Sequence, residues 1–145
     1  MDDALVWDGN WAWSLPLIVV TVIVHALSMV FITDVIIRAA QHVTRRHLMF
    51  ALLIGAATLL AIILHALEAG IWAGVYVALG ALPDGKSAVL YSLNAMTSYG
   101  HEHLELADHW QLMGALEALN GMILFGLTTA FLYGMIRRLL IDRRE

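Results

Sequence analysis

The chain has 145 residues, of which 61% are hydrophobic and only 14% are charged. A soluble domain carries about 25% charged residues, so this composition excludes an ordinary soluble globular protein. The absence of cysteine excludes disulfides and thiolate metal sites. The acidic start of the chain, with Asp2, Asp3 and Asp8, differs from the basic start of a signal peptide, so none is expected.

Three long stretches of the sequence carry no Asp, Glu, Lys or Arg: residues 9–33, 48–67 and 118–136. Each stretch can supply the roughly 20 apolar residues that a helix needs to cross a bilayer. Backbone groups find no water partner in lipid, so helix is the expected form of all three stretches.

We therefore expect an all-α membrane protein with a single membrane domain over residues 1–145. After a short outer segment, Pro16 suits the first turn of a membrane helix. Pro83-Asp84-Gly85 is a turn signal, and the helix expected from Lys86 to Met96 is too short to cross a bilayer. In chain order, the predicted elements are span one at 14–37, span two at 48–82, a short helix and loop at 86–109, and span three at 110–138.

The positive charges indicate the orientation of the chain in the membrane. All but Lys86 follow span one or span three, at Arg38, Arg45, Arg46, Arg137, Arg138, Arg143 and Arg144. The positive-inside rule therefore places the first loop and the C-terminus in the cytoplasm, and the N-terminus and residues 82–109 outside. The tryptophans fall near the same outer interface, at Trp7, Trp11, Trp13, Trp72 and Trp110.

The loop before span three carries the most informative pattern in the sequence. Residues 97–103 read Thr-Ser-Tyr-Gly-His-Glu-His. This resembles the selectivity filter of potassium channels, which typically reads Thr-X-Gly-Tyr-Gly, often with another Thr before it and Asp after it. Thr97, Ser98, Tyr99 and Gly100 match the first half of that pattern. His101, Glu102 and His103 replace its tyrosine, second glycine and aspartate.

Span three adds a second resemblance. Residues 120–130 read Asn-Gly-Met-Ile-Leu-Phe-Gly-Leu-Thr-Thr-Ala. In the inner helix of simple potassium channels, a hinge glycine is followed five residues later by Phe-Gly-Leu-X-Thr-Ala. Gly121 takes the hinge position, and Met122, Phe125 and Thr129 would face the cavity. The same glycine could instead allow a close helix contact.

Together these patterns resemble the small bacterial three-span, potassium-channel-like family of pore-loop channels. The resemblance implies a tetrameric pore with a re-entrant pore helix and filter loop at 86–109. Span two would be the outer helix and span three the inner helix. It also implies a homotetramer in the bacterial inner membrane that conducts inorganic cations, with no enzymatic activity and no nucleic-acid partner.

The departures from the filter pattern change the expected chemistry. The second filter glycine adopts backbone angles that a residue with a side chain resists, so Glu102 is expected to disrupt the outer half of a standard filter. Four copies of Glu102 would form a carboxylate ring that attracts cations, divalent ions most strongly. The sequence therefore predicts a pore for K⁺, Na⁺ or Ca²⁺ that is non-selective or prefers divalent ions, or else a nonconducting pore homologue.

The outer loop also offers metal ligands. His101, Glu102 and His103, with His109 or Glu105 nearby, could bind Zn²⁺ or another divalent ion at the outer mouth. The resemblance further suggests that Asn94 supports the filter through His103. No cofactor is required for the pore interpretation.

Four ionisable residues lie within or near the apolar spans: His25, His65, Glu68 and Glu117. Such groups are costly in lipid and face protein. His25 and His65 lie at similar depths, and His65 and Glu68 share a helix face, so the three can form a polar clasp. Glu117 is expected to face the pore helix or the next subunit. The alternative function is a membrane metal- or haem-binding protein that uses these histidines and the outer ones.

Overall fold

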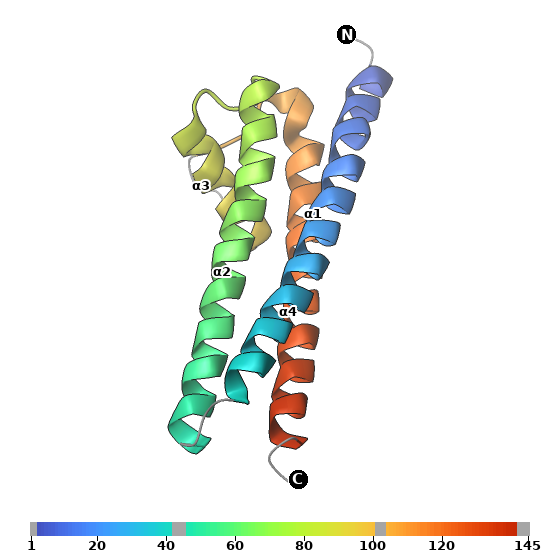
Figure 1. Ribbon diagram of the computed structural model, residues 1–145. Coiled ribbons are helices and arrows are strands. Elements are labelled where there is room, and N and C mark those ends of the chain that lie inside the picture. The colour runs from blue at the N-terminus through green and yellow to red at the C-terminus, as the bar shows by residue number, and fades with distance from the viewer. Residues whose placement is uncertain (1–2, 42–45, 101–103, 142–145) are drawn as a thin grey trace.

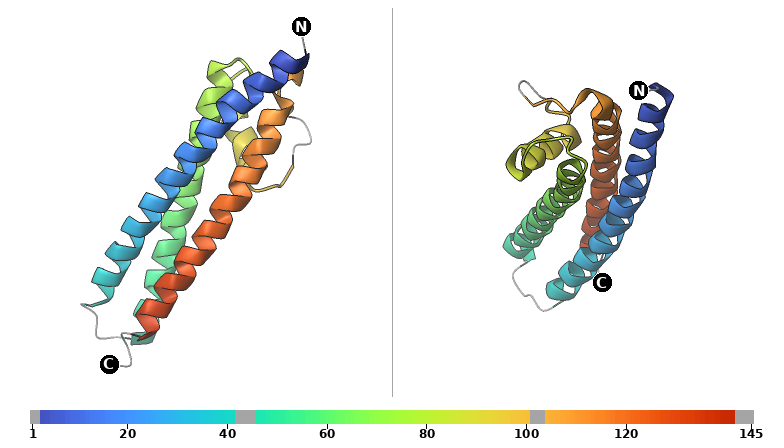
Figure 2. Two further views of the ribbon diagram at one scale, coloured as in Figure 1. Left: turned by 90° about the vertical axis from the view of Figure 1, so that its right-hand side faces the viewer. Right: turned by 90° about the horizontal axis from the view of Figure 1, so that it is seen from above.

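The computed structural model describes residues 3–41, 46–100 and 104–141, and every regular element in these ranges is helical. Three long helices, α1 (Asp3–Ala40), α2 (Arg46–Ala78) and α4 (Gln111–Ile141), lie side by side (Figures 1 and 2). The short helix α3 (Gly85–Met96) packs against α2 and α4, at the end of the bundle where α1 begins. A single 3₁₀ turn, η1 (Asp108–Trp110), leads into α4.

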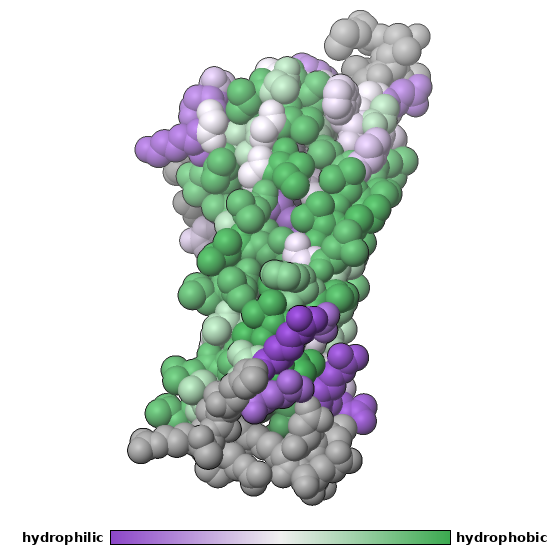
Figure 3. Space-filling model, in the orientation of Figure 1, coloured by the Kyte–Doolittle hydropathy of each residue, from purple (hydrophilic) through white to green (hydrophobic). Residues whose placement is uncertain are grey.

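The three long helices are long and apolar enough to cross a membrane, over Trp7–Ala40, Leu48–Ala78 and Asp108–Leu140. Figure 3 shows a broad hydrophobic belt around the middle of the molecule, with hydrophilic side chains toward its two ends. Large apolar side chains in this belt are exposed, among them Leu27 (67%), Phe31 (68%) and Leu59 (58%). A surface of this kind is stable in lipid rather than in water, so the chain is a membrane-embedded helical protein.

The first helix begins earlier than expected. The sequence predicted an outer segment followed by a helix with Pro16 in its first turn, whereas α1 starts at Asp3 and contains Pro16 in its interior. The early turns are anchored by tertiary contacts. The Asn10 side chain donates a hydrogen bond to the His109 carbonyl (2.7 Å) and accepts one from the Met113 backbone amide (2.9 Å). These bonds tie α1 to the start of α4 and offset the cost of an internal proline.

The second helix ends at Ala78 rather than near Leu82. Gly80 adopts a positive φ of 66°, a conformation that favours glycine. The amides of Ala81 and Gly80 bond the carbonyls of Tyr76 (2.8 Å) and Val77 (3.1 Å), which is the Schellman arrangement that closes a helix. The helix therefore stops at a local backbone signal, although the sequence stays apolar for several more residues.

The short helix α3 starts at the predicted turn. Asp84 is its N-cap, and its carboxylate accepts hydrogen bonds from the Ser87 amide (3.0 Å) and hydroxyl (2.8 Å). The bond from the Ser87 backbone amide is the main reason that the pKa of the Asp84 carboxyl is lowered. An ionised carboxylate at this position also complements the positive end of the helix dipole.

Two glycines let α3 lie close to α4. A Cβ added at Gly121 would overlap the Met96 carbonyl oxygen and lie 2.6 Å from the Met96 Cα. A Cβ added at Gly114 would overlap the Tyr91 hydroxyl. No atom outside the local helix lies within 4 Å of such a Cβ at Gly126 or Gly134. The glycines at 114 and 121, one heptad apart on α4, therefore allow close packing of the short helix.

Trp72 differs from the sequence expectation. It was expected at the outer interface, but it is fully buried in a core cluster that includes Tyr76 and Met113. Trp7, Trp11 and Trp13 on α1 are exposed, as an interfacial belt requires. The neighbouring elements decide which face of α2 is buried, and here α3 and α4 cover the face that carries Trp72.

Candidate functional site

The segment after α3 is the filter-like part of the chain. Thr97, Ser98, Tyr99 and Gly100 are all exposed, Tyr99 by 85%. Ser98 and Gly100 both have positive φ values, 55° and 91°. The conformation of Gly100 therefore suits glycine, as its alignment with a filter glycine requires. The Thr97 hydroxyl donates a hydrogen bond to the Leu93 carbonyl, four residues earlier in the same chain (2.7 Å). His101, Glu102 and His103 lie outside the described residues.

Contacts with Ala81, Gly114 and Gly121 define the path of this segment. Ala107 donates a backbone hydrogen bond to Ala81 (3.3 Å), so the chain leaves and returns at the same level of the bundle. Between these residues the chain descends along α4, from the contact of Tyr91 with Gly114 to that of Met96 with Gly121. A groove of about 260 Å³ lies beside this segment. It is lined by residues of α3, including Asn94, by residues of α4, and by Ser98 and Gly100.

The cavity-facing residues suggested by the sequence share one exposed stripe on α4. Met122 is 62% exposed, Phe125 is 41% exposed and Thr129 is exposed as well. The Thr129 hydroxyl is bonded to the Phe125 carbonyl (2.9 Å), so it does not disturb the helix. The spacing of three and four residues places these side chains on one face. In the described part of the chain, Phe125 packs on His65 of α2, and Met122 and Thr129 remain exposed.

Glu117 lies beside α3, close to Tyr91 and Ser92, which is one of the two environments expected for it. It is fully buried within the chain, and its Oε2 accepts a hydrogen bond from the Tyr76 hydroxyl on α2 (2.7 Å). It therefore does not face a neighbouring subunit. Asn120, one turn further along α4, donates to Thr21 on α1 (2.9 Å). Burial and, secondarily, the nearby Glu117 carboxylate raise the pKa of Tyr91 on α3 to about 12.

The most concentrated polar cluster joins the three long helices near mid-span. It consists of His25 on α1, His65 and Glu68 on α2, and Thr128 on α4, and we call it the His–Glu cluster. His25, Glu68 and Thr128 are buried, and the His65 side chain is 11% exposed. The sequence predicts that His25, His65 and Glu68 form one polar cluster, and their contacts confirm this.

The distances in the His–Glu cluster are short. The His25 Nδ1 lies 3.0 Å from Glu68 Oε1, and the His65 Nδ1 lies 3.4 Å from Glu68 Oε2. The two Nε2 atoms, on the opposite side of each ring, lie 3.1 and 3.0 Å from the Thr128 hydroxyl. Both rings are thus oriented the same way, with Nδ1 toward the carboxylate and Nε2 toward the hydroxyl.

Thr128 was not identified from the sequence. The resemblance to an inner helix drew attention to Thr129, but Thr128 is the residue that contacts both histidines. The sequence carries no signal that separates Thr128 from Thr129, because each hydroxyl donates to the carbonyl four residues before it, Leu124 (3.0 Å) and Phe125 (2.9 Å). Phe125 covers the cluster from α4, since its ring stacks on His65 with centroids 4.4 Å apart.

The geometry does not suit the haem alternative. Two axial histidines bind an iron from opposite faces of a macrocycle that lies between them. Here the His25 and His65 ring centroids are only 5.1 Å apart, and both rings contact one threonine hydroxyl. The arrangement leaves no space for a porphyrin between the rings.

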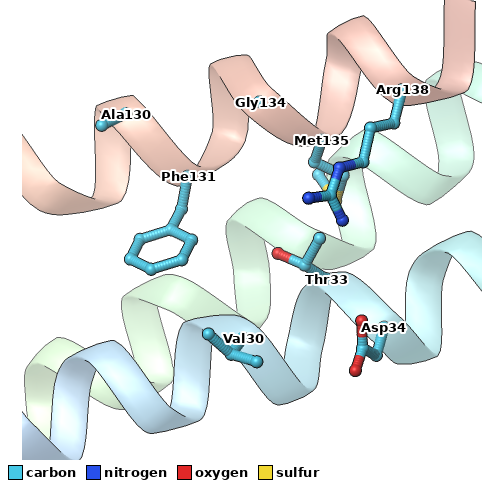
Figure 4. Close-up of a pocket in the computed structure, with 8 residues that line it drawn as sticks. All are labelled: Val30, Thr33, Asp34, Ala130, Phe131, Gly134, Met135 and Arg138. Atoms are coloured by element: carbon cyan, nitrogen blue, oxygen red, sulfur yellow. The ribbon is translucent and has the colours of Figure 1, made fainter. Parts of the chain in front are cut away.

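A second groove lies between α1 and α4 toward the end of the bundle where α1 ends. It has a volume of about 290 Å³ and is lined by Val30, Thr33, Asp34, Ala130, Phe131, Gly134, Met135 and Arg138. Figure 4 shows Asp34 on α1 and Arg138 on α4 at the same end of this groove. The ion pairs found in the described part of the chain involve neither residue.

Comparison of the chain with models of protein families, with curated proteins and with solved structures found no match. The function is therefore inferred from the residues of the chain and their geometry.

Proposed function

We propose that the chain is the subunit of a tetrameric, pore-loop cation channel. The observation that carries the proposal is the excursion between Ala81 and Ala107. It enters and leaves at one level, yet it reaches Gly121, which lies about 15 Å along α4 from Gln111, the first residue of that helix, at a rise of 1.5 Å per residue. A short helix that lies beside a long apolar helix, with the chain coming back to the level at which it left, is the arrangement expected of a pore loop.

The exposed surfaces support this proposal. The filter-like residues 97–100, together with Met122, Thr129 and part of the Phe125 side chain, are exposed in the described part of the chain. Irregular backbone is stable at membrane depth only where protein or a water-filled path surrounds it. Copies of the same chain around a four-fold axis would surround it, with the stripe lining a central cavity.

The expected selectivity follows from the residues after Gly100. A ladder of carbonyl rings discriminates between K⁺ and Na⁺. Glu102 in place of the second glycine would interrupt that ladder and add a carboxylate ring, so the channel is expected to be non-selective or to prefer Ca²⁺. His101 and His103 beside it would add affinity for Zn²⁺ at the outer mouth. With the basic ends of α1 and α4 in the cytoplasm, this mouth would face outward across a bacterial inner membrane.

Two measurements test the proposal. Native mass spectrometry or crosslinking of the protein in detergent is expected to show four chains. A monomer or dimer as the only species would overturn the tetramer. Flux from liposomes would then be measured with K⁺, Na⁺ and Ca²⁺. Glu102→Gln is expected to reduce Ca²⁺ flux, and Asp108→Asn, at an exposed acidic residue before α4, serves as the control variant. A tetramer without flux for any of these ions would indicate a nonconducting homologue, and strong K⁺ preference would refute the selectivity argument.

A further inference from the structure

The hydrogen bonds of the His–Glu cluster constrain the positions of its protons. A threonine hydroxyl has one hydrogen, and the Thr128 hydroxyl donates it to the Leu124 carbonyl (3.0 Å). It can therefore only accept from the two imidazoles. Both Nε2 atoms then carry hydrogens, because each lies within hydrogen-bond distance of Thr128. With the Thr128 hydrogen directed at Leu124, both histidines therefore have the same tautomer; a hydrogen directed at one Nε2 would instead place the hydrogen of that ring on Nδ1.

This tautomer directs two Nδ1 lone pairs toward one carboxylate. The His25 Nδ1 lies 3.0 Å from Glu68 Oε1, so a proton must lie between these atoms. The Nδ1 of His65 is buried and has no hydrogen-bond partner, although it lies 3.4 Å from Glu68 Oε2. Lone pairs that face each other in a buried site repel unless a cation separates them. Two protons would satisfy both contacts with one net positive charge, and a divalent ion on two neutral imidazoles and one carboxylate carries the same net charge.

A divalent metal ion satisfies the same atoms. One ligand atom from each of His25, His65 and Glu68, a ring nitrogen or a carboxylate oxygen, lies within 4.8 Å of the other two. Atoms at the corners of a tetrahedron with metal bonds of about 2.1 Å are about 3.4 Å apart. The two nitrogen–oxygen distances of 3.0 and 3.4 Å are already close to this value. We propose that the His–Glu cluster is a Zn²⁺-class transition-metal site with His25, His65 and Glu68 as protein ligands.

The surroundings fit this assignment. Ligating histidines usually donate their second ring N–H to a fixed acceptor, and Thr128 provides that acceptor for both rings. The side toward α3 is apolar, formed by Val22, Ala69, Leu93, Met96 and Leu124. No charge other than Glu68 is found near the rings among the described residues, so one carboxylate and two neutral imidazoles form the ligand set. A fourth position is left for water.

Zinc binding to the purified protein tests the site directly. The protein is prepared with a non-histidine affinity tag, stripped with a chelator and titrated with Zn²⁺ by calorimetry. The triple variant His101→Gln, Glu102→Gln, His103→Gln serves as the background, so that the outer loop does not contribute. One Zn²⁺ per chain is expected, with X-ray absorption showing two imidazoles and oxygen ligands. About one proton per Zn²⁺ should be released near neutral pH, because the proton between His25 and Glu68 is displaced.

Variants separate a metal site from a polar clasp. Glu68→Gln keeps the shape of the side chain and is expected to weaken binding at least 100-fold. Thr128→Val retains all three ligands and should weaken binding about 10- to 100-fold, whereas Thr128→Ser should bind like the parent. If the parent binds Zn²⁺ no better than Glu68→Gln, or if Thr128→Val and Thr128→Ser bind equally, the assignment is wrong. These readouts do not depend on tetramer formation or ion flux, so they can fail while the proposed pore stands.

Discussion

Replacing Gly121 by alanine tests the close packing of α3 on α4. The added methyl group would lie 2.6 Å from the Met96 Cα and 2.8 Å from its carbonyl carbon. Non-bonded carbons are most stable at about 3.5–4.0 Å, so α3 would have to retreat by about 1 Å. The obstacle is backbone rather than the tip of a flexible side chain. Overpacking of this kind costs about 1–3 kcal/mol.

Gly126→Ala provides a matched control on the same helix. Its methyl group would meet no atom within 4 Å outside the local helix. Both substitutions gain the same preference of alanine for helix, about 1 kcal/mol, so this gain cancels when the two variants are compared. Gly121→Ala is therefore expected to be about 1–3 kcal/mol less stable than Gly126→Ala.

The assay is unfolding in detergent followed by tryptophan fluorescence, with helix content checked by circular dichroism. Equal stability of the two variants would refute the close contact between Gly121 and Met96. If Gly121 acts only as a hinge, Gly121→Ala and Gly126→Ala should be equally stable, and Gly121→Ala should alter the ion flux. Gly114→Ala should have an intermediate effect, because its obstacles are side-chain atoms of Tyr91 and Leu106 rather than backbone.

Three further outcomes follow from the polar contacts. Tyr76→Phe removes the hydrogen bond to the buried Glu117 carboxylate and should destabilise the protein by about 1–3 kcal/mol in the same unfolding assay; no change would mean that this bond is absent. Asn10→Ala removes the cap on the Met113 amide and should release the first turns of α1, seen as faster hydrogen exchange there than in the parent. The pKa of Tyr91 is raised to about 12 in the folded protein, whereas a tyrosine in the unfolded chain has a pKa of about 10. The contribution of Tyr91 to stability is therefore complete below a pH of about 10 and is lost as the pH rises toward 12. Tyr91→Phe should flatten this decline in stability.

The sequence by itself determined the membrane character of the protein and the order of its helices. Lipid offers no hydrogen-bond partners, so uncharged stretches of this length have helix as their stable form. The turn at Pro83-Asp84-Gly85 and the short run after it also defined α3, because the cap is encoded locally. His25, His65 and Glu68 could be grouped from depth and helical spacing alone.

Only the tertiary structure decided which helix faces meet. Helices that are apolar on all sides carry little amphipathic signal, so the sequence could not show that Trp72 lies inside the chain. The early start of α1 depends on Asn10, whose partners lie about a hundred residues away. Thr128 rather than Thr129 contacts the histidines because the rotation of α4 is set by its packing against α1, α2 and α3. Such rotations depend on many distant contacts at once, and the local sequence does not encode them.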